Sequence, residues 1–154
     1  MPGPLGVHDH HELTEAQRDT LRYIERYDLR AEVEAAIEAD QVPRSDAKSA
    51  ERELKRFLAV VYLEGGKAGA LAPSREVDAL WHNFILNTRS YHRFCQAVYG
   101  EYLHHVPAGG EADVEKVQEG IELVRRLFGD VDERVWKEGF RICFVPPKLE
   151  GPTT

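Results

Sequence analysis

Apolar residues between positions 45 and 63 follow the repeat of an α-helix. They recur at intervals of three and four residues, which places one apolar stripe along a helical surface. The stripe consists of Leu54, Phe57, Leu58, Val61 and Tyr62. We expect Ser45 to cap this helix, which runs to about Leu63, and Gly65 and Gly66 to end it.

Two shorter helices are predicted before this one. Thr14 is followed three positions later by Gln17, a capping-box pattern in which each residue's side chain bonds the other's backbone N–H. The helix that begins there has apolar positions at Leu21, Ile24 and Tyr27. A second helix is expected over 29–39, with Val33, Ala36 and Ile37 facing the core.

Three more helices are predicted after it. The first follows a cap at Ser74 and carries the apolar residues Val77, Leu80, Trp81, Phe84 and Ile85. After a break at Asn87 and Thr88, the next carries Tyr91, Phe94, Cys95, Val98 and Tyr99 and ends at Gly100. The last spans roughly 112–128. No set of strand-like segments exists to form a sheet, so the pattern predicts an all-α protein, an irregular bundle of about six helices.

The chain is expected to form one domain with two flanking segments. Its 154 residues suffice for one hydrophobic core, and two domains would be cramped. Residues 1–12, rich in Pro, Gly and His, are expected to form a flexible lead-in. Residues 13–140 would form the helical domain, and residues 141–154 a tail that includes Cys143. The lead-in histidines suit adventitious metal binding, although an unstructured polar segment explains them more simply.

Charge and composition narrow the classes of partner. A formal net charge of −7 repels phosphate backbones and argues against nucleic-acid binding. No apolar run approaches membrane-spanning length, and the first residues lack the basic start and apolar core of a secretory signal. Two cysteines fit free thiols in a reducing cytosol. We therefore expect a cytoplasmic protein whose partner is an unidentified protein or small molecule, with no nucleic acid and no membrane.

Residues 78–107 gather the side chains that carry chemistry. Asp78 and His82 are four residues apart on one predicted helix, so they are neighbours on one face. The carboxylate can accept the imidazole N–H and raise its basicity. The antiparallel next helix brings Cys95, and an adjacent pair, His104 and His105, follows. Because neighbouring side chains diverge, only one of that pair is expected to point toward His82 and Cys95.

This cluster suggests a metal site. Imidazole and thiolate are the ligands that zinc and copper prefer, so His82, Cys95 and His104 or His105 are candidate zinc ligands. Asp78 would be either a fourth ligand or the hydrogen-bond partner of His82. An open coordination position would allow the metal to activate water. The spacing lacks the short paired ligands that mark zinc fingers.

Two alternatives remain open for the same residues. In the first, the cluster is a packed polar network in a non-catalytic interaction module, with Cys95 acting as a small hydrophobe. The acidic face formed by Glu32, Glu34, Glu38 and Asp40 would then supply the surface, although a solvated face explains it equally well. Alternatively, Cys95 would be a nucleophile with His82 or His104 as base, which requires a partly exposed thiol of lowered pKa.

The central stretch also resembles a known family. The residues are Pro73, Val77, Asp78, Trp81, His82, Ile85, Leu86, Thr88, Tyr91, Cys95, Gly100, His104, His105 and Pro107, with Leu127-Phe128-Gly129 and Trp136 downstream. Together they resemble the glycine-rich domain-containing protein-like family, in its stand-alone bacterial form. That family often carries a second histidine where this chain has Phe84. The resemblance implies that these residues act as a unit and implies no established reaction.

Overall fold

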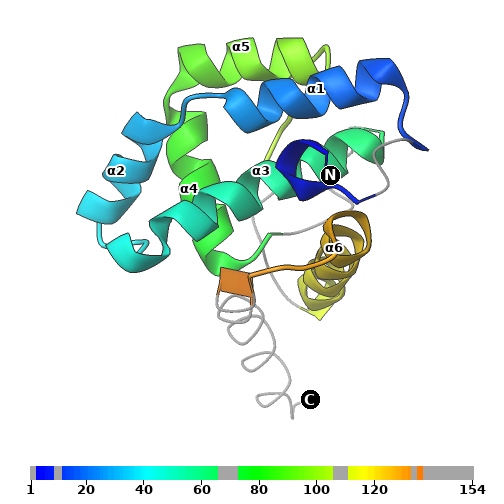
Figure 1. Cartoon of the computed structure of the whole chain (residues 1–154). Coiled ribbons are helices and arrows are strands. Elements are labelled where there is room, and N and C mark those ends of the chain that lie inside the picture. The colour runs from blue at the N-terminus through cyan, green and yellow to red at the C-terminus, as the bar shows by residue number, and fades with distance from the viewer. Residues whose placement is uncertain (1–2, 9–11, 66–72, 106–110, 133–134, 137–154) are drawn as a thin grey trace.

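The structure, a computed structural model, describes residues 3–8, 12–65, 73–105, 111–132 and 135–136. Over these residues the chain is all-α and contains no strand, as predicted (Figure 1). The described residues form six α-helices: α1 (Glu15–Arg26), α2 (Arg30–Glu38), α3 (Ala47–Leu63), α4 (Arg75–Leu86), α5 (Thr88–Val98) and α6 (Glu111–Phe128). None of the helices in these ranges is long and apolar enough to cross a membrane.

Local capping sets where two of these helices begin. Thr14 and Gln17 form the predicted capping box at α1, with hydrogen bonds of 3.0 and 2.9 Å. Ser74 caps α4 by accepting the N–H of Val77 at 3.4 Å. The start of α3 differs from the prediction, because residues 44–46 form a short 3-10 turn and the N-cap is Asp46, not Ser45.

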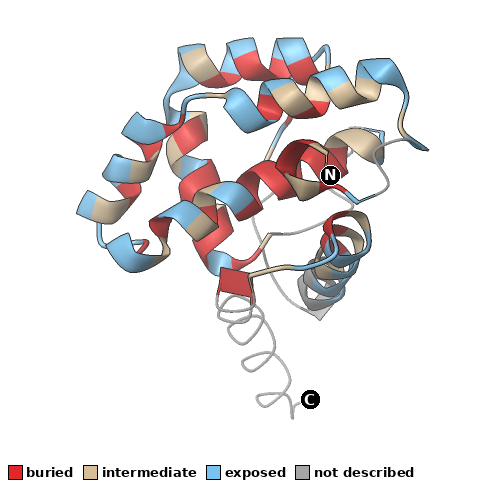
Figure 2. Cartoon of the chain, viewed as in Figure 1, coloured by how far each residue is buried: buried red, intermediate tan, exposed pale blue. Residues whose placement is uncertain are grey.

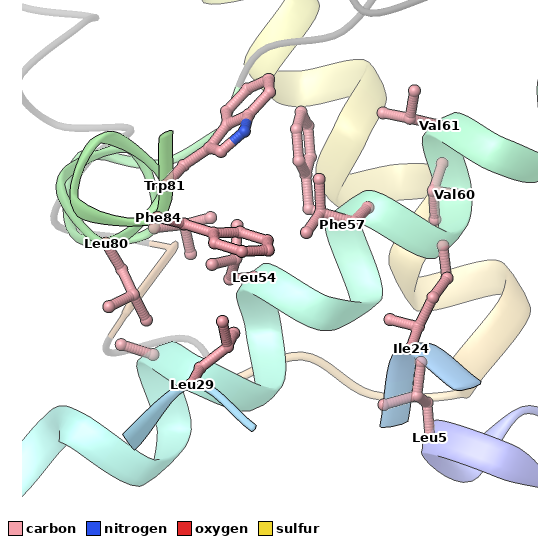
Figure 3. Close-up of a cluster of buried hydrophobic side chains, with 14 of the residues drawn as sticks. Leu5, Ile24, Leu29, Leu54, Phe57, Val60, Val61, Leu80, Trp81 and Phe84 are labelled. Atoms are coloured by element: carbon pink, nitrogen blue, oxygen red, sulfur yellow. The ribbon is translucent and has the colours of Figure 1, made fainter. Parts of the chain in front are cut away.

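Helix α3 is the centre of the molecule. Helices α1, α4 and α6 pack against it, and Figure 1 shows it crossing the middle of the fold. The buried surface in Figure 2 runs along α3 and α4. The stripe predicted for α3 is too narrow, since Ala59 and Val60 are also fully buried. Figure 3 shows Leu54 and Phe57 of α3 beside Trp81 and Phe84 of α4.

Helix α3 also buries charged side chains, each of which has partners. The ammonium of Lys55 donates to the carbonyl oxygens of Glu25 and Tyr27 at 2.8 and 2.7 Å, next to the end of α1. Arg56 donates to the carbonyl of Leu5 at 3.0 Å and to the carboxylate of Glu53 at 3.3 Å. Because burial of a charge is tolerated only with such partners, these contacts explain why α3 is enclosed on more than its apolar face.

Part of the expected lead-in belongs to the core. Leu5 and Val7 are buried at 6% and 2% exposure, and the N–H of His8 donates to the carbonyl of Leu127 at 3.0 Å. Residues 4–8 therefore pack against α3 and the end of α6, which departs from the flexible lead-in expected for residues 1–12. The Pro and Gly content suggested mobility, but two apolar side chains are enough to anchor this short segment. His10, His11 and the tail with Cys143 lie outside the described residues.

Candidate metal centre

Three of the five predicted ligands meet at one point. Asp78, His82 and His105 each offer one ligand atom, and these atoms all lie within 4.8 Å of one another. Nε2 of His105 is 2.5 Å from Oδ1 of Asp78. Nδ1 of His82 is 3.7 Å from Oδ2 of the same carboxylate. The carboxylate thus lies in reach of both imidazoles.

Helix α4 supplies two of these side chains. Asp78 and His82 are one turn apart, as the spacing predicted, so they lie on the same side of the helix. The apolar residues of α4, among them Val77, Leu80 and Trp81, are buried against the rest of the fold. That packing fixes the rotation of α4 and directs Asp78 and His82 away from the core, where they are 29% and 56% exposed.

His105 comes from the segment that follows α5. Gly100, at φ +76°, ends the helix in the left-handed conformation that glycine adopts readily. In the segment beyond it, which has no regular secondary structure, exposure alternates: Leu103 is buried, His104 is exposed and the His105 side chain is only 9% exposed. The two adjacent histidines therefore diverge, as expected, and His105 is the one that reaches His82. The ring of His104 instead packs against Tyr102.

The centre has one closed side and one open side. The His105 ring packs against the indole of Trp81, at a centroid distance of 4.3 Å, and stacks on His82 at 4.6 Å with an interplanar angle of 17°. Trp81 is 2% exposed, so it shields His105 from solvent. His82 faces solvent on the other side. An ion held here would keep positions open to water.

Cys95 lies elsewhere. It has no exposed surface, and its sulfur accepts the N–H of Leu103 at 3.5 Å. Burial raises the pKa of the Cys95 thiol, and the hydrogen bond from the N–H of Leu103 only partly opposes that increase. A buried thiol with a raised pKa is the opposite of the exposed, acidic thiol that a nucleophile needs. The structure therefore brings neither Cys95 nor His104 to the Asp78–His82–His105 group.

A buried chain of hydrogen bonds lies directly beneath the centre. The indole N–H of Trp81 donates to the hydroxyl of Tyr91 at 3.2 Å, and that hydroxyl donates to the carbonyl of Leu103 at 2.6 Å. Sequence reasoning did not identify Leu103 as part of the site. The sequence does carry a signal for this residue. If residues 103–105 are extended, side chains two positions apart lie on the same side, so an apolar residue at 103 predicts that residue 105 also turns inward.

Comparison with known proteins identifies a family. Residues 19–135 match the model of a protein family described as UCP032817-like. The matched range covers more than half of the chain and includes Asp78, His82 and His105. No curated protein and no solved structure matches the chain.

Proposed function

The chain belongs to the UCP032817-like family, and we propose that it binds a divalent metal of the zinc type through Asp78, His82 and His105. The observation that supports the proposal is the convergence of one ligand atom from each residue within 4.8 Å. Imidazole nitrogen and carboxylate oxygen are both zinc ligands, and three protein ligands are typical of catalytic zinc sites.

The distances are close to what a tetrahedral ion requires. With bonds of about 2.1 Å, ligand atoms around zinc lie about 3.4 Å apart. The His82–Asp78 separation of 3.7 Å nearly meets this requirement. The His105–Asp78 contact of 2.5 Å would have to open as the ion enters. The separation of His105 and Asp78 would increase by about 0.9 Å to reach the value around zinc.

The exposed His82 edge would leave a coordination position for water. A zinc ion lowers the pKa of bound water to about 7, which supplies hydroxide for hydrolytic chemistry near neutral pH. The same donor set also suits iron, copper and nickel, so the metal is identified by measurement and not by the ligands alone. Cys95 and His104, which were expected as ligands, are not part of the proposed set.

The family resemblance and the cellular location remain proposals of the same kind. The residues that suggested the glycine-rich domain-containing protein-like family include all three proposed ligands, which is why we retain that relationship as a hypothesis. We also propose a cytoplasmic location, because Cys95 is a free buried thiol of the sort that a reducing compartment preserves.

A second candidate function is a packed polar network in a non-catalytic interaction module. It is supported by the direct contact between His105 and Asp78, which satisfies both side chains without an ion. The Trp81–Tyr91–Leu103 hydrogen bonds are likewise complete. In this alternative, His82 and His105 contribute to stability and the protein takes up no metal.

Elemental analysis decides between the two candidates. The protein is loaded with zinc, dialysed and measured with His8, His10 and His11 substituted, because residues 4–8 pack on the core and deleting them would disturb it. We expect one zinc per chain, lost in His105→Ala and in His82→Ala. His104→Ala, the adjacent histidine that points away, is the matched control and should retain the metal. No zinc in the parent protein, or equal loss in His104→Ala and His105→Ala, would overturn the metal proposal.

A further inference from the structure

We propose that Tyr91 is a positioning residue that sets the place of His105 in the metal centre, acting through the backbone of Leu103. The inference rests on the proposed metal-binding function and concerns how the third ligand is held. Two ligands, Asp78 and His82, belong to α4, whereas His105 comes from a different segment. Something must therefore fix that segment relative to α4.

The hydroxyl of Tyr91 has a fixed hydrogen-bonding direction. It accepts the indole N–H of Trp81, which is a donor only, at 3.2 Å, and donates its own proton to the carbonyl of Leu103 at 2.6 Å. Tyr91 has no exposed surface, so water does not compete for either bond. The hydroxyl therefore links α4, α5 and the segment after α5 at one atom.

The other backbone group of Leu103 is also held by α5. Its N–H donates to the sulfur of Cys95 at 3.5 Å, and its side chain is 3% exposed. With both polar groups and the side chain fixed, Leu103 has little freedom to rotate. His105, two residues further on, inherits the orientation of that segment, which places its ring on Trp81.

Trp81 completes the arrangement because it contacts both ends of it. Its N–H bonds Tyr91 while its ring packs on His105 at 4.3 Å. Loss of the Tyr91 hydroxyl would free the Leu103 carbonyl, release the Trp81 N–H and loosen the contact that holds the His105 ring. Asp78 and His82 would be unaffected, since α4 keeps its own packing.

The test compares two Tyr→Phe variants. Tyr91→Phe removes the hydroxyl that bonds Leu103, and Tyr99→Phe removes a hydroxyl that donates instead to the carbonyl of Leu58 in α3, at 2.8 Å. Cobalt(II) is the probe, because its absorbance reports coordination and its titration gives affinity. We expect Tyr91→Phe to bind cobalt about 10- to 100-fold more weakly, as is usual for residues that orient a ligand. Tyr99→Phe should bind like the parent protein.

A second readout needs no metal. The ring protons of His105 lie in the ring current of Trp81, so their chemical shifts report the position of the imidazole. We expect these shifts to change in metal-free Tyr91→Phe and to stay in Tyr99→Phe. If the parent protein binds no cobalt while the shifts still change selectively, the metal proposal fails and the positioning role stands.

Unchanged His105 shifts in Tyr91→Phe would overturn the inference, as would equal effects in the two variants. If Tyr91→Phe does not fold, Cys95→Ala provides the test, because it releases the N–H of Leu103. It must then shift the His105 resonances, and unchanged resonances would overturn the inference.

Discussion

The indole N–H of Trp136 donates a hydrogen bond of 2.9 Å to Oε1 of Glu53, a carboxylate with no exposed surface. The other oxygen of Glu53 accepts the guanidinium of Arg56 and the backbone N–H of Asp132, both at 3.3 Å. One buried carboxylate on α3 therefore fixes the segment that follows α6. Arg56 also donates to the carbonyls of Leu5 and Asp130, so the same pair reaches the N-terminal segment.

Removing the Glu53 carboxylate should destabilise the protein strongly. Glu53→Ala leaves the buried guanidinium of Arg56 with only the exposed carboxylate of Asp130, at 3.2 Å, as an anionic partner. Breaking a buried pair by removing one member costs about 3–5 kcal/mol. The matched control is Glu34→Ala, which breaks an exposed pair with Arg44 at 3.0 Å and should leave the unfolding midpoint nearly unchanged, because solvent screens that pair. Urea denaturation measures both losses, and similar values for the two variants would contradict the assigned role of Glu53.

The N-terminal segment should contribute to stability. Leu5 is 6% exposed and Leu86 is 77% exposed, so the same substitution tests opposite environments. Leu5→Ala should lower the free energy of unfolding by about 2–5 kcal/mol through lost burial and a residual cavity. Leu86→Ala should stay within about 0.5 kcal/mol of the parent protein. If Leu5→Ala were as stable as Leu86→Ala, the N-terminal segment would not contribute to the core, and the prediction of a flexible lead-in would hold.

Stability should fall at alkaline pH. Burial raises the pKa of Cys95, Tyr91 and Tyr99 above the ordinary values of 9.0 for a thiol and 10.0 for a phenol. Above about pH 9 the folded state thus holds protons that the unfolded chain has released, and the free energy of unfolding decreases as pH rises. Below that pH these groups are protonated in both states and contribute no pH dependence.

Denaturation series from about pH 8 to pH 11 measure this decrease. Cys95→Ala should remove the part that begins near the thiol value of 9.0 and leave the part that begins near the phenol value of 10.0. A free energy of unfolding that is constant over this range would show that the three groups titrate alike in both states.

The thiol of Cys95 should be unreactive in the folded protein. Its burial and raised pKa both suppress the thiolate that alkylating reagents attack. In a Cys143→Ser background, labelling near neutral pH should be slow in buffer and fast in denaturant. Rapid labelling of the native protein would contradict this prediction and support the hypothesis that Cys95 is a nucleophile.

Much of the fold could be predicted because its signals are local. Thr14 and Ser74 cap helices through bonds to residues three positions away, and the sequence alone shows such spacing. The predicted start of α3 was wrong because residues 44–46 form a 3-10 turn, which resembles the first turn of an α-helix and is hard to tell from it by sequence. The Glu53–Trp136 bond was not predicted, since it joins residues 83 positions apart.

In the candidate site, too, local features were predictable and long-range contacts were not. Helical spacing predicted that Asp78 and His82 lie on one face of a helix. The adjacency of His104 and His105 predicted that their side chains diverge. Which histidine turns inward depended on Leu103, whose backbone is held by the tertiary contacts of Tyr91 and Cys95. Cys95 was expected to serve as a ligand although its place on the apolar stripe of α5 already indicated burial.

The partners of Glu53 and Arg56 also determine when the chain can complete its folding during synthesis. A ribosome delivers both charges with α3 long before it delivers Asp130, Asp132 and Trp136, which complete their bonds. Until then Glu53 and Arg56 have each other and Leu5 but lack three of their hydrogen bonds, so their burial costs more free energy. Closure of the core therefore waits for nearly the whole domain to be synthesised, and a chain stopped before Asp130 would expose α3 to chaperones and proteases.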